Sequence, residues 1–134
     1  MNYLLFIFYL LYRAGLIRYR HKSVIIDNRE YNLEIADTTL KRALGLMYRK
    51  DIEDNSGLLI DFKHEADIEI WNYNMRFAID LIYLNSNFEI TKIYINMPSC
   101  KSIFKTLKVR GYGRYVIEIK HKKENVNIKN IKIL

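Results

Sequence analysis

Cysteine and proline are almost absent from this chain of 134 residues, and histidine and glycine are scarce. The single cysteine, Cys100, excludes an intrachain disulfide and a zinc site made of several cysteines. The three histidines do not share the spacing of metal ligands, and neither a His-x-His nor a His-Glu-x-x-His pattern occurs. A glycine-rich loop of the kind that cradles phosphate is also missing. We therefore expect no metal ion and no other cofactor, and we interpret Cys100 as a structural or incidental thiol.

The composition is that of a folded chain. Half of the residues are hydrophobic and 28% are charged, which is typical of a globular protein and not of a disordered one. The length is sufficient for one domain with a substantial core, and insufficient for two. We expect a single β domain over residues 23–134, preceded by an apolar segment over residues 1–22.

Charge is distributed unevenly along the chain. The formal net charge of +7 is the balance of +4 over residues 1–22, −5 over residues 23–98 and +8 over residues 99–134. A basic terminus can bind anionic lipid or nucleic acid. Lysines that keep exposed edge strands from aggregating produce the same pattern. Both interpretations stay open from sequence alone.

The amino terminus carries an unbroken apolar and aromatic run from Tyr3 to Tyr12. As a helix, Tyr3–Ile17 would be about 22 Å long, shorter than the roughly 30 Å of a hydrocarbon core. Four basic residues follow, and they would hold the domain on the cytoplasmic side of a membrane. We expect membrane association through this helix, projecting from a cytoplasmic domain. The alternatives are a soluble cytoplasmic protein that buries the run and an exported protein that loses it.

The remainder of the chain reads as short strands with one main helix. A helix is expected near residues 38–47, capped by Asp37 or Thr38, because Leu40, Ala43, Leu44 and Met47 recur at the spacing of one buried face. Many short strands and one helix favour a compact antiparallel β sandwich or barrel. The expected strands cover residues 23–26, 31–36, 57–62, 68–75, 77–84, 88–95, 115–120 and 128–134.

Several segments together resemble one known family. They are Leu33 to Thr38, the run Gly45-Leu46-Met47-Tyr48-Arg49, the pair Trp71 and Asn74, and Ile79-Asp80. Their order and spacing resemble the domain of unknown function 192 family, also called uncharacterised protein family 0127. The resemblance implies a compact, mainly β domain and supplies no settled activity.

The chain departs from this family at two places. The family usually reads Trp-Met-Lys-Asn-Thr where this chain reads Trp-Asn-Tyr-Asn-Met over residues 71–75. If the missing basic residue serves the family's function, this member has lost it or uses Arg76 from a neighbouring position. The glycine-rich stretch with which the family closes is absent from residues 121–134.

Asp80 is the most conspicuous charged residue because it interrupts an otherwise apolar strand. A buried carboxylate needs a partner or a shifted pKa. We predict a structural ion pair of Asp80 with Arg49 or, second, with Arg42. A role in orienting a ligand is the alternative.

A ligand site is predicted from Trp71, Asn74, Asp80 and Arg49. Aromatic rings beside an amide suit a sugar ring or a base, through stacking and hydrogen bonds. The competing interpretations are a core position for Trp71 and a backbone-bridging role for Asn74.

Three functions follow from these observations, and no catalytic residue is assigned in the one we favour. That function is non-enzymatic binding of a small polar ligand or a protein partner near a membrane. The second is a hydrolase that uses Asp80 and Glu118 as paired carboxylates. The third, and least favoured, is nucleic-acid binding by the basic residues between positions 101 and 123.

Overall fold

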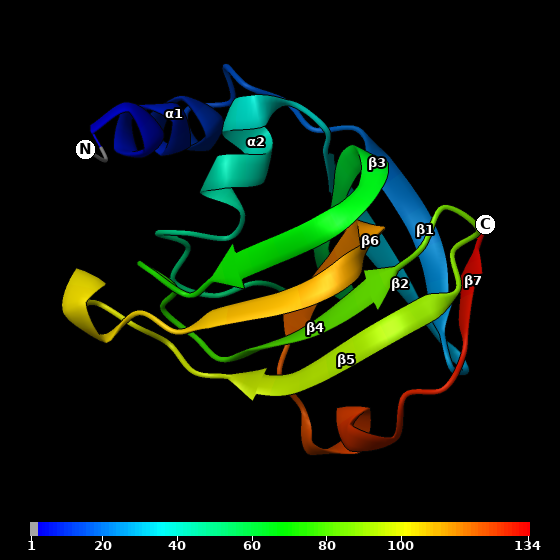
Figure 1. Cartoon of the computed structure of the whole chain (residues 1–134). Helices are drawn as coiled ribbons and strands as arrows, with labels where there is room; N and C mark the ends of the chain where they lie inside the picture. The colour runs from blue at the N-terminus through cyan, green and yellow to red at the C-terminus, as the bar shows by residue number, and fades with distance from the viewer. Residues whose placement is uncertain (1–2) are drawn as a thin grey trace.

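Seven strands form one curled sheet, a half-barrel with both helices on the same side (Figure 1). The computed structural model describes residues 3–134. Within this range the elements are α1 (Tyr3–Arg13), β1 (His21–Ile26), β2 (Arg29–Ala36), α2 (Thr39–Leu44), β3 (Ser56–Trp71), β4 (Ile79–Leu84), β5 (Ile90–Met97), η1 (Ile103–Lys105), β6 (Lys108–Lys120), η2 (Lys123–Asn127) and β7 (Ile131–Ile133). The mainly β fold with one main helix and an amino-terminal apolar helix is confirmed.

The strands lie in the order β5-β4-β6-β3-β2-β1-β7. All neighbouring pairs are antiparallel except β2 and β3, which run parallel, so the sheet is mixed. A parallel pair needs a crossover, and α2 with the loop after it provides that connection. The two strands expected at 57–62 and 68–75 join into the long β3, which bends where its register with β6 shifts between Asp61 and Ala66.

Each face of the sheet carries its own apolar core. Leu58, Ile60, Leu81 and Val116 belong to the core on the face that the two helices share. Leu33, Leu59, Ile82 and Ile117 belong to the core on the opposite face, which β7 and η2 complete. Because strand residues alternate between faces, covering both faces turns β4 into a run of six buried residues.

Helix α2 is shorter than predicted and begins where expected. The Thr38 side chain accepts a hydrogen bond from the Lys41 N–H at 3.3 Å, which confirms it as the N-cap. Leu44 and Met47 are buried as predicted and Leu40 is half-buried, but Ala43 is exposed. The predicted buried face is therefore wrong at Ala43: a helix of six residues turns only part of that stripe inward.

Helix α1 is helical as expected but does not project. Its Tyr9 is buried against Leu44 and Met47, and Figure 1 shows α1 lying alongside α2. The hydroxyl of Tyr12 also donates a hydrogen bond to Glu34 of β2. Over residues 3–134, none of the helices combines the length and apolarity needed to cross a membrane.

Candidate functional site

One row of side chains across the sheet contains three titratable groups. His21, Glu34, Leu58 and Glu118 lie opposite one another in register on β1, β2, β3 and β6. Residues that pair across neighbouring strands point to the same face. Two carboxylates and one imidazole therefore share the face that the helices cover.

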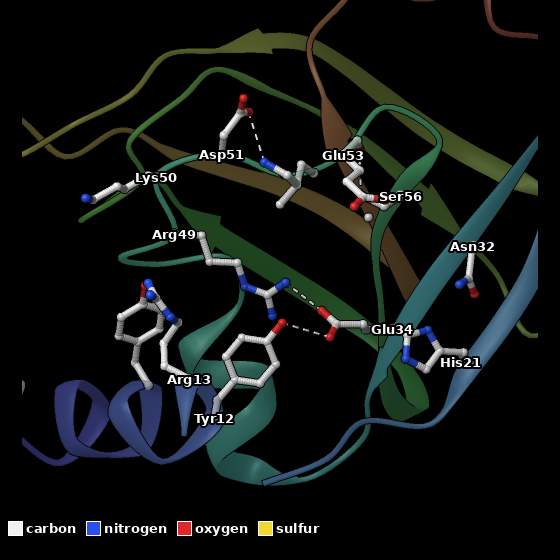
Figure 2. Close-up of a pocket in the computed structure, with 13 residues that line it drawn as sticks. Tyr12, Arg13, His21, Asn32, Glu34, Arg49, Lys50, Asp51, Glu53 and Ser56 are labelled. Carbon is white, nitrogen blue, oxygen red and sulfur yellow. Dashed lines mark hydrogen bonds and ion pairs between the residues drawn. The ribbon is translucent and has the colours of Figure 1, made fainter. Parts of the chain in front are cut away.

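A hollow of about 630 Å³ opens over one end of this row. It lies between α1, the paired strands β1 and β2, and the segment from Arg49 to Gly57, a loop that leads into the start of β3, and we call it the polar hollow. Figure 2 shows Arg49 reaching from the loop, and Tyr12 from α1, to the same Glu34 carboxylate. His21 and Asn32 add polar groups from the strands.

The centre of the polar hollow is an ion pair with an aromatic cover. Arg49 Nη1 lies 2.6 Å from Glu34 Oε1, and the Tyr12 hydroxyl lies 3.1 Å from Glu34 Oε2. The guanidinium sits 4.5 Å from the centroid of the Tyr12 ring, a cation–π distance. Burial raises the pKa of Tyr12, and the Glu34 charge raises it further against the opposing effect of Arg49. Tyr12 is therefore a neutral donor.

The Arg49 guanidinium is only partly satisfied. Its residue is 9% exposed, and its Nε and Nη2 atoms are buried without a hydrogen-bond partner among residues 3–134. Buried guanidinium groups are normally paired through several of their five donors. These two nitrogens therefore retain hydrogen-bonding capacity in a residue that lines the polar hollow.

Two unusual backbone conformations set the position of Arg49. Tyr48 and Asn74 both have positive φ, 70° and 60°, and the Tyr48 N–H donates to the Asn74 carbonyl at 3.0 Å. Asparagine tolerates this left-handed region better than most residues. This bond uses the backbone carbonyl of Asn74, so the predicted bridging role of its side-chain amide stays a prediction.

The predicted ligand set does not converge on one cleft. Arg49 lines the polar hollow, whereas Trp71 lines a second, smaller hollow between α2 and β3. The Asn74 carbonyl holds the Tyr48 backbone, and Asp80 lies on the opposite face of the sheet. The prediction of one shared ligand site is therefore wrong, because β4 turns Asp80 away from the helices. Arg49 and Trp71 each line a hollow, but not the same one.

Asp80 is fully buried as predicted, but its partners differ. Its Oδ1 accepts the Asn96 N–H at 2.7 Å and lies 2.8 Å from His121 Nδ1, and its Oδ2 accepts from Asn125 Nδ2 at 2.7 Å. The predicted pair with Arg49 or Arg42 is wrong. Arg49 binds Glu34, and Arg42 donates to the Asp61 carbonyl at 3.2 Å.

The proposed carboxylate pair of a hydrolase is also ruled out by register. Asp80 lies opposite Ile119, and Glu118 lies opposite Leu81. Neighbouring positions along a strand face opposite sides, so the two carboxylates point away from each other through the sheet. They do not meet at one substrate.

The basic carboxyl-terminal region is largely neutralised by the acidic middle of the chain. Of the eight cations predicted to form a nucleic-acid surface between positions 101 and 123, five form ion pairs at 2.8–3.8 Å. These pairs are Lys108 and Arg110 with Glu69, Arg114 with Asp61, Lys120 with Asp51, and Lys122 with Asp54. The uneven charge along the sequence thus becomes a mixed surface in three dimensions.

Sequence reasoning missed the buried amides and Glu34. Asn72 is 1% exposed and bridges the Pro98 carbonyl and the Leu107 N–H, both at 2.8 Å. Glu34 was placed on the polar side of its strand, and only an expectation that both sheet faces are covered would have marked it as half-buried. Residues 3–134 contain no cluster of three or more His, Cys, Asp or Glu side chains arranged to hold a metal ion.

Comparisons with known proteins agree with the fold. Among solved structures, a candidate transcription regulator from Sinorhizobium meliloti has a TM-score of 0.74 at 21% identity, covering 87% of this chain and 96% of that one. A protein of unknown function from Novosphingobium aromaticivorans has a TM-score of 0.68 at 21% identity, covering 87% and 84%. At these identities the likeness shows the fold alone.

Sequence comparison supplies the family. UPF0127 protein PH1112 from Pyrococcus horikoshii is 29% identical over 89 residues, which are 66% of this chain and 72% of that protein. The DUF192 model, described as an uncharacterized ACR, matches residues 22–130, so α1 precedes the matched region. The chain therefore belongs to the uncharacterised DUF192 family.

Proposed function

We propose that this protein is a non-enzymatic binding domain that holds a small polar ligand in the polar hollow. The observation that carries the proposal is Arg49, a buried cation with one edge paired to Glu34 and its Nε and Nη2 unpaired. Groups of both signs surround it, with Lys50 and Arg13 on one side and Glu34 and Glu53 on the other. This mixture suits a ligand that both donates and accepts hydrogen bonds, such as an amino acid.

Titration with free amino acids, followed by backbone NMR, tests this proposal. We expect shift changes concentrated in α1, in His21 to Glu34 and in the loop from Arg49 to Gly57. The Arg49→Lys variant keeps the charge but loses the planar fork, so it should weaken binding. Exposed Asp67→Asn, on β3 and outside the lining of the polar hollow, is the matched control and should bind normally. Shift changes confined to another face, or none at millimolar amino acid, would contradict the proposal.

We also propose that α1 lies flat on an anionic membrane surface. Its inner side packs on the domain through Tyr9, yet its outer side is apolar as well, with Tyr3, Leu4 and Ile7 each more than half exposed. A helix that faces water normally carries polar residues outward. Arg18 and Arg20 follow α1 in the chain and are exposed, and basic residues near an apolar helix favour anionic lipid.

Co-sedimentation with vesicles tests the membrane proposal. The protein should bind vesicles that contain phosphatidylserine more strongly than phosphatidylcholine vesicles, and added salt should weaken the binding. Leu4→Glu with Ile7→Glu should abolish it. Val126→Glu, at an exposed apolar position on η2, is the control and should leave it intact. A dimer that the same double variant dissociates, without vesicle binding, would show instead that a second copy covers α1.

A further inference from the structure

The second hollow contains a buried acid without a partner. This Glu118 cleft, of about 280 Å³, lies between α2 and β3. Glu118 is 3% exposed, and its Oε1 has no hydrogen-bond partner among residues 3–134. The rest of the cleft lining is largely apolar or aromatic and includes Phe62, Trp71 and Met75.

Gly45 allows the chain to pass directly over this acid. It ends α2 with φ 52° and ψ −131°, a backbone conformation that residues other than glycine rarely adopt. A Cβ built at this position would lie 3.4 Å from Glu118 Oε1. On the side of α2, the Glu118 carboxylate is therefore covered by the backbone of Gly45, which has no side chain to donate a hydrogen bond.

The charged side chains near Glu118 all interact with other groups. Arg49 influences Glu118 at a distance but is paired with Glu34. Arg42 donates to the Asp61 carbonyl, and Glu69 pairs with Arg110 and Lys108 outside the cleft. Among the described residues Glu118 makes no ion pair. Burial raises its pKa to about 7, so the proton is lost readily when a cation arrives.

We propose that the Glu118 cleft binds a small primary ammonium ion with an apolar body. The ammonium donates hydrogen bonds to the Glu118 carboxylate, and the apolar body packs against Met75 and the rings of Trp71 and Phe62. Aromatic faces attract a cation in addition to burying apolar surface. This site is independent of the polar hollow, because the two hollows share no lining residue.

The experiment uses cyclohexylmethylamine as the probe and cyclohexylmethanol as its neutral counterpart. Trp71 is the only tryptophan in the chain, so intrinsic fluorescence reports on this cleft, and the Met75 methyl group gives an independent NMR signal. We expect saturable binding of the amine at both reporters. The alcohol should bind about tenfold more weakly, since it lacks the charge-assisted hydrogen bond.

The matched variants are Glu118→Gln and Asp54→Asn. Glu118→Gln should lower the affinity for the amine about tenfold and leave that for the alcohol nearly unchanged. Asp54→Asn, at an exposed acid that does not line the cleft, should change neither. Equal affinities of the wild-type protein for amine and alcohol would overturn the proposal without reliance on any variant. Unchanged amine binding by Glu118→Gln, or no response at Trp71 and Met75, would overturn it as well.

Discussion

Asp80 and Glu118 are buried carboxylates on neighbouring strands, and their surroundings differ in almost every respect. Asp80 is fully buried, and both of its oxygens accept hydrogen bonds from the segments around Asn96 and Asn125. Glu118 is almost as buried, but its Oε1 has no partner among residues 3–134 and its neighbours are largely apolar. Burial alone therefore does not separate a structural acid from an acid held ready for a ligand; the hydrogen-bond partners do.

The largest effect is expected from Asp80→Asn. The amide would place a donor against the Asn125 and Lys122 N–H groups, which now donate to Oδ2. Loss of a buried charged partner should lower the free energy of unfolding by roughly 3–5 kcal/mol, measured by urea denaturation. Asp54→Asn, on the surface, should change it by less than about 0.5 kcal/mol. A loss below about 1 kcal/mol for Asp80→Asn would break the comparison.

Glu118→Gln should act in the opposite direction, raising the free energy of unfolding, and only above about pH 4.5. The folded-state pKa of Glu118, about 7, lies above its ordinary value of 4.5. Between these values the unfolded chain has released the proton and the folded protein has kept it, so wild-type stability falls as the pH rises from about 4.5 to 7. A glutamine cannot ionise and avoids this loss.

The variant should therefore equal the wild type near pH 4.5 and exceed its unfolding free energy by up to about 3 kcal/mol above pH 8. Urea denaturation across this range measures the difference. An equal destabilisation at every pH would show that Glu118 is instead satisfied in the folded protein.

Asn125→Ala sharpens the Asp80 side of the comparison. The variant removes one buried donor at 2.7 Å and leaves the carboxylate with Asn96 and His121. A hydrogen bond to a charged group is worth about 1.5–3 kcal/mol, so the cost should be smaller than that of Asp80→Asn. If Asn125→Ala costs nothing, the Asn125 amide does not hold Asp80 in solution.

The smallest effect is expected at the polar hollow. Tyr12→Phe removes only the hydroxyl that donates to Glu34, and it keeps the ring against Arg49. We expect a loss of about 0.5–1.5 kcal/mol in the free energy of unfolding. A much larger loss would mean that α1 is held on the domain chiefly by this bond and not by the packing of Tyr9.

Local features were predictable from sequence, and long-range partners were not. The Thr38 cap and the strand over residues 31–36 depend on short spacings, and the family membership depends on the order of several short segments along the chain. The side-chain partners of Asp80, His121 and Asn125, are 41 and 45 residues away, and only folding brings them near. Nothing in the local pattern around Asp80 distinguishes His121 from an arginine as its partner.

The amino-terminal run shows a second limit of sequence reasoning. Uninterrupted apolar residues have the same pattern whether they face lipid or protein, so packing of α1 on α2 was as compatible with the sequence as projection. Glu34 was unpredictable for a related reason. A strand with one apolar side predicts that its other side faces water, unless α1 and the Arg49 loop are known to cover it.

The most direct test of the comparison is an NMR titration of the Glu118 side-chain carboxyl carbon in protein labelled at glutamate. Assignment comes from the spectrum of Glu118→Gln, in which that signal is missing. We expect a midpoint of about 7, well separated from those of surface glutamates. A midpoint near the ordinary value of 4.5 would show that Glu118 is hydrated or paired, and would contradict its assignment as the unpartnered acid of the Glu118 cleft.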